Sequence, residues 1–309
     1  MSRHSFAALP EGTADATNPG DLMDVMHDTK SEPDFMSGRG NWKAFDLPLD
    51  RIFSAAARWR ELIGPVDKPW LCWNVEPDWC VLQQRLVAAV GWTPVVGFDP
   101  RVGPPPLIAG AVLVDFNAGF GFPNLYPHFP LEFAFLFAPR LAFWHSDFLL
   151  DLERMEQFAA RFAGLADGEM TAVAPIPAGF INRLPWRRRY WELLGCTTSG
   201  ASRSQFENGR GWWMHYYNHP NFKGKVWSRS RRWDHGFGIK AWELDCGGVV
   251  HRIAGETIKD GHFTRIGKKQ NYKATAANNV FRNLHADLRA NFDLSQCAEK
   301  MRISHLLRG

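Results

Sequence analysis

Two kinds of hydrophobic pattern alternate through the middle of the chain. Short apolar runs with the length of buried strands occur at residues 69–75, 93–99, 107–117, 140–144 and 168–175. In other segments the apolar residues recur every three or four positions, as on one face of a helix, at residues 50–65, 76–92, 131–138 and 149–162. Strands that alternate with helices at this spacing predict an α/β fold with a mostly parallel central sheet flanked by helices.

The two ends of the chain lack this alternation. Residues 1–50 are rich in Asp, Gly, Pro, Ser and Thr, which predicts an irregular N-terminal extension. Residues 51–270 form the predicted α/β domain, whose later part is dense in Gly, Asn, Arg, Trp and Tyr and indicates loops that close over a ligand. Residues 271–309 are predicted to be a C-terminal helical segment, in which Asp293 and Gln296 have the spacing of a capping box.

Charge is divided unevenly along the chain. Residues 1–50 carry nine acidic and four basic side chains, whereas the whole chain has a net charge of +4, so the remainder is strongly basic. A basic body favours an anionic ligand such as a nucleotide diphosphate, an anionic glycan or a nucleic acid backbone.

Cysteine usage and hydropathy restrict the expected location of the protein. The five cysteines form no CxxC pair and no dense framework, which favours reduced thiols in the cytoplasm. No run of about 18 uninterrupted apolar residues exists, and the first residues lack the pattern of a secretory signal. We therefore expect a protein without a transmembrane segment that is cytoplasmic, either free or peripheral to the membrane.

Polar side chains recur where the predicted strands end. They are Asn74 and Glu76, Asp99, Asp115 and Asn117, and finally His145 and Asp147. In open α/β sheets the carboxyl ends of the strands border the crevice that binds ligands, so these side chains predict a polar crevice. His145 and Asp147 flank Ser146 and point the same way in an extended chain, which brings two metal-capable groups together. The alternative is that Asp147 merely caps the following helix.

This order of elements resembles the GT-A fold of nucleotide-sugar-dependent glycosyltransferases. In that family a strand ends in an Asp-x-Asp metal-binding motif and a helix follows it, and here His-Ser-Asp at residues 145–147 stands in that place. The family often supplies one more ligand, commonly His, from near the end of the domain, and one branch follows it with Gly and Lys that hold the donor diphosphate. In the stretch DGHFTRIGKKQNY, the residues His262, Gly267, Lys268 and Lys269 have that order, although their spacing differs from that of the branch.

The resemblance implies that a sugar passes from a nucleotide-diphosphate donor to an acceptor hydroxyl, with Mn²⁺ or Mg²⁺ as cofactor. Asp147, His262 and His145 would hold the metal, and Lys268 or Lys269 would neutralise the leaving nucleotide. The implied donor-binding residues are Asn74, Glu76, Asp99, His145, Asp147, Lys268 and Lys269. His145 departs from the family pattern, because an imidazole is a poorer partner than a carboxylate for a hard cation.

Two carboxylates are candidates for the general base that an inverting transferase needs. Asp234 lies in the stretch RRWDHGFGIKAWE, between the metal motif and the final His, and it could equally be a turn residue before Gly236. Glu192 is the weaker candidate, because its Trp and Leu neighbours indicate a helix face.

A cluster of basic and aromatic residues indicates the acceptor side. Arg229, Arg231, Arg232 and Trp233 could grip an anionic glycan, the donor diphosphate or a nucleic acid backbone. We expect a glycan, lipid-linked or glycoconjugate acceptor in preference to modified bases in DNA, because most enzymes of this fold act on glycans.

Three other functions remain open. The stretch VLVDFNAGFGFP is reminiscent of the glycine-rich loop of methyltransferases and dinucleotide enzymes, although its prolines oppose an immediate helix. A metal-dependent hydrolase could instead use His145, Asp147, Asp234 and His262. The His in place of a motif Asp also fits a non-catalytic nucleotide-sugar-binding protein.

Overall fold

A mixed sheet of seven strands forms the centre of the protein in a computed structural model. The structure describes residues 49–98, 102–116, 128–174, 189–212, 214, 236–263 and 293–308, all of which lie in one of the chain's two units, Pro33–Gly309. The strands are β1 (Pro69–Asn74), β2 (Thr93–Phe98), β3 (Val112–Leu113), β4 (Arg140–Trp144), β5 (Glu169–Ala174), β6 (Trp191–Thr198) and β7 (Val249–Ala254).

The strand order is β3-β2-β1-β4-β6-β5-β7, and most neighbours are parallel. The exception is β6, which runs antiparallel to β4 on one side and to β5 on the other. The predicted α/β fold with a mostly parallel central sheet flanked by helices is therefore confirmed. An antiparallel strand in its interior was not predicted.

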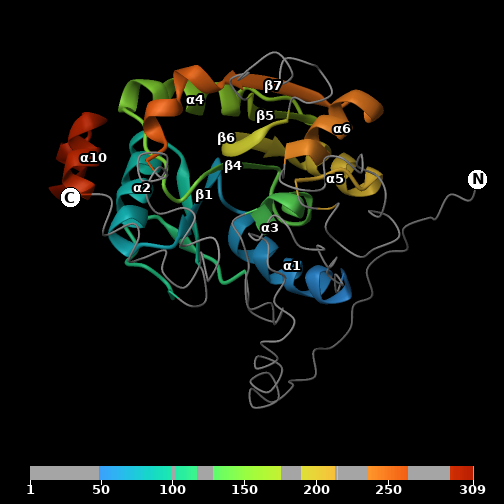
Figure 1. Cartoon of the computed structure of the whole chain (residues 1–309). Coiled ribbons are helices and arrows are strands. Elements are labelled where there is room, and N and C mark those ends of the chain that lie inside the picture. Colours follow the sequence, from blue (N-terminus) through green and yellow to red (C-terminus); the bar gives the residue numbers. More distant parts are fainter. Residues whose placement is uncertain are drawn as a thin grey trace, which may run out of the picture. The chain divides into compact units, whose positions relative to one another are not determined.

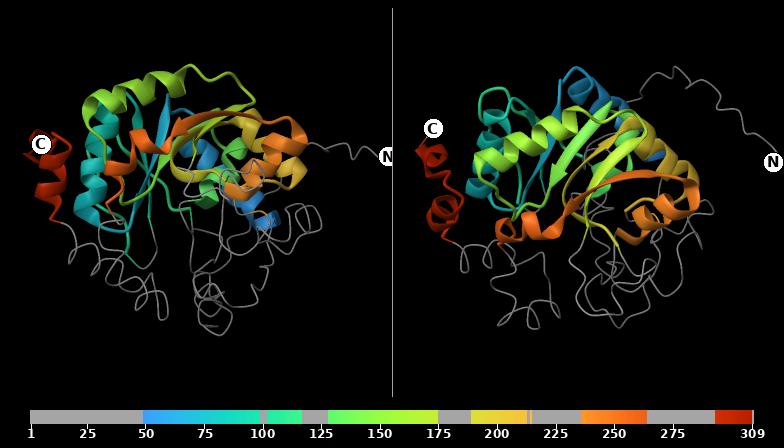
Figure 2. Two further views of the ribbon diagram at one scale, coloured as in Figure 1. Left: turned by 45° about the horizontal axis from the view of Figure 1, so that its top comes forward. Right: turned by 90° about the horizontal axis from the view of Figure 1, so that it is seen from above.

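Helices cover both faces of this sheet (Figure 1). The larger ones are α1 (Leu49–Ile63), α2 (Pro77–Ala89), α4 (Leu152–Ala163), α5 (Ser199–Asn208) and α6 (Gly236–Cys246), and α10 (Leu294–Lys300) follows near the C-terminus. Buried side chains of α1, α5 and α6 pack in one apolar cluster, and those of α2, α4 and α10 pack in another. All views place α10 beside α2 (Figure 2), where Arg85 donates a hydrogen bond of 2.6 Å to the Leu306 carbonyl.

The burial of β1 explains why its sequence is continuously apolar. All six residues of this strand are buried. Leu71 and Trp73 face the cluster that contains α1, whereas Trp70 and Cys72 face the cluster that contains α2. A strand covered on both faces has no solvent side, so it shows no polar alternation.

Several predicted elements have different limits in the structure. The strand predicted at 107–117 is reduced to the two residues of β3. The helix predicted at 131–138 is a short α3 (His128–Glu132) followed by a 3₁₀ turn, η3 (Ala134–Leu136). The helix predicted at 149–162 begins only at Leu152.

Part of the region expected to form loops is regular structure. It contains β6 and α5, and Glu192 therefore lies on a strand and not on a helix face. In the C-terminal segment, the Asp293 side chain accepts hydrogen bonds from the amides of Ser295 and Gln296, so the predicted cap is present. Residues 1–48 of the predicted N-terminal extension and residues 264–292 lie outside the described residues, and α1 begins at Leu49, just inside the predicted extension.

Two further expectations concern location. All five cysteines are free thiols in the structure. Among the described helices, none combines the length and apolar character needed to cross a bilayer.

Candidate functional site

The polar motif at 145–147 lies at the carboxyl edge of the sheet, next to the start of β6. Because β6 is antiparallel to β4, Trp144 at the end of β4 pairs with Leu194 near the beginning of β6. The His145 amide continues this ladder by donating a hydrogen bond of 3.0 Å to the Leu193 carbonyl. The first residues of β6 therefore lie at the carboxyl end of β4, and Glu192 is at the same edge of the sheet as His145. In a strand parallel to β4, the first residues would lie at the opposite edge.

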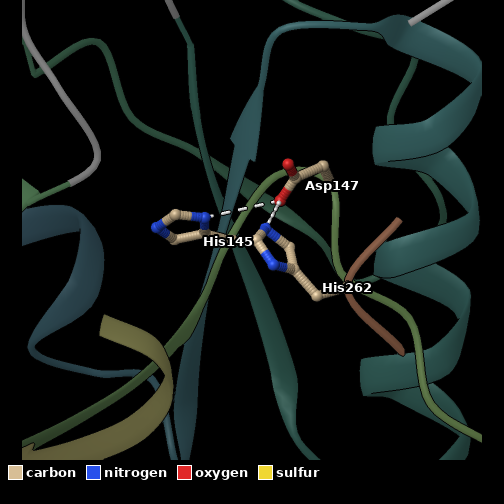
Figure 3. A group of neighbouring side chains, drawn as sticks. All are labelled: His145, Asp147 and His262. Atoms are coloured by element: carbon tan, nitrogen blue, oxygen red, sulfur yellow. Dashed lines mark ion pairs between the residues drawn. The ribbon is translucent and has the colours of Figure 1, made fainter. Parts of the chain in front are cut away.

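Three side chains converge at this edge (Figure 3). The Asp147 Oδ1 atom is 3.4 Å from His145 Nδ1 and 3.3 Å from His262 Nε2. One potential ligand atom from each of the three residues lies within 4.8 Å of the others. Asp147 and His262 are buried, while the His145 side chain keeps 29% of its surface exposed. Solvent therefore reaches the cluster at His145, whereas Asp147 and His262 are shielded from it.

Glu192 extends the cluster on the other side of His145. Its Oε1 atom is 3.5 Å from His145 Nε2, and the residue is buried. The imidazole of His145 thus lies between two carboxylates, Asp147 at one ring nitrogen and Glu192 at the other.

His262 reaches Asp147 through a short antiparallel contact between two loops. Phe148 and His262 form an isolated β-bridge, the Leu149 amide donates to the Gly261 carbonyl at 3.0 Å, and the Phe263 amide donates to the Asp147 carbonyl at 3.3 Å. A Cβ at Gly261 would lie 2.2 Å from the Leu149 carbonyl oxygen, so this approach requires glycine. Main-chain pairing therefore fixes the separation of the Asp147 and His262 side chains.

A side chain of α2 binds the backbone of the turn that carries His145 and Asp147. The Gln83 side-chain amide is fully buried and donates hydrogen bonds to the carbonyls of His145, at 2.8 Å, and of Phe148, at 2.9 Å. These two bonds span the motif. They fix its backbone without occupying its side chains.

Asp147 does not cap the helix that follows it. The N-cap of α4 is Asp151, whose side chain accepts the Arg154 amide at 2.9 Å. The alternative role considered for Asp147 is therefore wrong, and its carboxylate is left to the two imidazoles.

The electrostatics of the cluster favour ionised groups in spite of burial. Burial opposes protonation of His145, but hydrogen bonding with Asp147 and Glu192 outweighs it and raises the pKa of His145 to about 10. Burial would also raise the pKa of Asp147, yet the neighbouring His262 and His145 hold that pKa well below its usual range. Without another cation, a protonated His145 offsets one of the two neighbouring carboxylate charges, those of Asp147 and Glu192. A metal ion would have to displace that proton.

The other described donor-binding candidates have structural contacts. Asn74, fully buried at the end of β1, donates a hydrogen bond of 2.8 Å to the Gly103 carbonyl. Glu76 caps α2 by accepting the Trp79 amide at 2.8 Å. Asp115, which was predicted only to line the polar crevice, follows β3 and is exposed.

The remaining candidates lie outside the described residues. They are Asp99, Asn117, Arg229, Arg231, Arg232, Trp233, Asp234, Lys268 and Lys269.

Sequence reasoning missed Gln83 and the pairing of Glu192 with His145. The sequence did carry a signal for the first, because Gln83 and Gln84 are consecutive amides that directly follow the apolar residues 79–82 of α2. Buried amides in such a position need hydrogen-bond partners. The partner of Glu192 had no local signal, since His145 follows β4, which is distant from Glu192 in the sequence.

The fold and site define the chain as an α/β protein with a His-Asp-His cluster at the edge of a mixed sheet. Comparison with known protein families, with curated proteins and with solved structures finds no match to this chain.

Proposed function

We propose that this chain is a metal-assisted glycosyltransferase that moves a sugar from a nucleotide-diphosphate donor to an acceptor hydroxyl. The observation that carries the proposal is the convergence of Asp147 and His262, with 3.3 Å between Oδ1 and Nε2, at the carboxyl edge of the sheet. The GT-A resemblance implies ligands from these two segments, and ligand sites of α/β proteins lie at this edge.

The donor set of the cluster fits a divalent cation. One carboxylate and two imidazoles offer an oxygen and two nitrogens within 4.8 Å of one another. A bound Mn²⁺ or Mg²⁺ supplies charge neutralisation for the donor diphosphate. Asp147, His145 and His262 would hold it, and the exposed side of His145 leaves an approach for the phosphates.

Other residues complete the proposed mechanism. Lys268 and Lys269 neutralise the negative charge that develops on the leaving nucleotide. Asp234 remains the candidate base that takes the proton from the acceptor hydroxyl, with Glu192 as the alternative. Because Glu192 contacts His145 at 3.5 Å, a proton-accepting role for Glu192 would compete with its ion pair. We therefore favour Asp234.

The acceptor and the location belong to the same proposal. The basic residues Arg229, Arg231 and Arg232 and the neighbouring Trp233 suit a glycan, lipid-linked or glycoconjugate acceptor, with modified DNA bases as the alternative. Free thiols fit a reducing compartment, so we propose that the activity is cytoplasmic, free or at a membrane surface.

Donor binding can be tested without knowing the acceptor. A nucleoside diphosphate together with Mn²⁺ should raise the melting temperature of the protein by several degrees, whereas S-adenosylmethionine should not. Asp147→Asn should abolish the metal-dependent part of this shift. The matched control is Asp67→Asn, since Asp67 precedes β1 at the opposite edge and its side chain is 88% exposed.

Turnover separates a transferase from a hydrolase. Slow release of the nucleoside diphosphate from a nucleotide-sugar, lost in Asp147→Asn and kept in Asp67→Asn, supports the transferase. A protein that binds metal, ignores every nucleotide-sugar and cleaves simple phosphate or carboxylic esters is a metal-dependent hydrolase, and the transferase proposal then fails.

A further inference from the structure

The metal-capable cluster is richer in nitrogen than a pair of carboxylates would be. Two of its three potential ligands are imidazoles, His145 and His262, and the third is the carboxylate of Asp147. Mg²⁺ and Ca²⁺ prefer oxygen ligands, whereas imidazole suits zinc, iron, nickel and copper. The composition of the cluster thus bears on which ion it takes.

The ring nitrogens are arranged as a metal site requires. His145 turns Nδ1 and His262 turns Nε2 toward the same atom, Asp147 Oδ1, at 3.4 and 3.3 Å. The two rings are edge to face, with an interplanar angle of 76° and centroids 5.6 Å apart. Each ring therefore presents one nitrogen to a common point beside the carboxylate.

Glu192 occupies the position of an outer partner for one of these rings. Its Oε1 faces His145 Nε2, the nitrogen that points away from Asp147. Histidines that bind metals commonly donate their second ring N–H to a carboxylate, which fixes the tautomer and orientation of the ring. The main chain of His145 is anchored to the same strand as Glu192, through Leu193.

We propose that His145, Asp147 and His262 form a site selective for divalent transition-metal ions over Mg²⁺ and Ca²⁺, with Glu192 as the residue that positions His145. This deepens the proposed glycosyltransferase, because it names the class of ion at the same site. Three protein ligands leave coordination positions open for oxygens of a bound substrate. Glu192 also restores a negative charge near the place where the motif has His instead of Asp.

Metal binding to the full chain tests this directly, with no donor present. Metal-free protein is titrated with Co²⁺, Zn²⁺, Mn²⁺ and Mg²⁺ in competition with a chromophoric chelator, and bound Co²⁺ is followed by its visible absorption. Affinity should be lowest for Mg²⁺ and should rise from Mn²⁺ to Co²⁺. The affinity for Mg²⁺ should be at least about 10²-fold lower than the affinity for Co²⁺ or Zn²⁺. Equal affinity for Mg²⁺ and Co²⁺, or no binding by folded protein, overturns the proposal.

Two variants test the roles of individual residues. His145→Asp replaces a nitrogen ligand by an oxygen ligand, so the preference for Co²⁺ over Mg²⁺ should fall by about 10-fold or more. Glu192→Gln should weaken Co²⁺ binding by about 10- to 100-fold and shift the absorption of the bound ion. An unchanged preference or an unchanged affinity, respectively, contradicts the assigned role.

The chain offers a matched control for Glu192→Gln. Glu169 also pairs with a histidine, His251, at 3.0 Å, but it begins β5 at the opposite edge of the sheet. Glu169→Gln should leave Co²⁺ binding unchanged, and loss of binding in this variant would place the ion elsewhere. Selective metal binding without donor turnover would refute the transferase alone, and turnover without selective binding would refute this inference alone.

Discussion

Gln83 offers the sharpest test of how the site is supported, because its role depends on hydrogen bonds alone. Replacing it by Met keeps a side chain of similar length and shape on α2. The change removes the hydrogen bonds to the carbonyls of His145 and Phe148, of 2.8 and 2.9 Å. The His145 carbonyl still accepts a hydrogen bond of 3.2 Å from the Phe148 amide, so this carbonyl loses only one of its two hydrogen bonds.

The expected cost follows from these two bonds. Each contributes about 0.5–1.5 kcal/mol net, and a buried carbonyl left without its donor costs about 1–3 kcal/mol. We expect Gln83→Met to lower the free energy of unfolding by about 2–4 kcal/mol, which corresponds to a fall in melting temperature of about 3–6 °C for a protein of this size. Metal affinity should fall as well, because the turn that aligns His145 and Asp147 loses its anchor.

Urea denaturation followed by circular dichroism measures the first effect, and chelator competition measures the second. The control is Gln157→Met on α4, where the side chain is exposed and the change should stay within about 0.5 kcal/mol. If Gln83→Met is as stable as this control and binds metal as tightly as the unchanged protein, the assigned role of Gln83 is wrong.

Three further substitutions test the surrounding fold by urea denaturation. Gly195→Ala should cost at least about 1–3 kcal/mol, because the added Cβ would lie 2.4 Å from the Thr171 carbonyl oxygen, and an unchanged midpoint would contradict this packing. Asp293→Ala should cost about 1 kcal/mol by removing the cap of α10, and an effect below a few tenths would deny the cap. Hydrogen bonding to Arg154 lowers the pKa of Asp260, so this carboxylate stabilises the fold above its unfolded pKa of about 4, and the contribution is lost as pH falls through the lower folded pKa. Asp260→Asn should therefore cost up to about 1 kcal/mol at pH 7 and progressively less below pH 4; a pH-independent difference would refute the ion pair.

The strands that sequence predicted best are those with continuous apolar runs. β1 and β4 are buried on both faces, and their hydrophobicity alone marks them. β6 escaped prediction because a glycine interrupts it and a charged residue stands near its start. The structure gives both a reason. Gly195 allows the Phe143 ring to approach within 2.6 Å of where a Cβ would lie, and Glu192 faces His145.

The candidate site was predicted unevenly for a related reason. The local spacing predicted that His145 and Asp147 lie close together, and the family resemblance predicted that His262 joins them. No local pattern could reveal that Phe148 and His262 form a bridge, since this pairing joins distant segments. Gln83 and Glu192 act on residues of other elements, so their roles become visible only when the sheet order is known.

The position of β6 also determines when the site can form during folding. β5 precedes β6 in the chain, yet β4 pairs with β6 and not with β5, so the two parts of the sheet join only after β6 has inserted between them. Contacts of such long sequence separation are slow to form. We therefore expect the cluster to assemble late, so that an ion bound there would not act as an early folding nucleus. It should leave the folding rate nearly unchanged and instead slow unfolding, so that metal protects the finished protein kinetically.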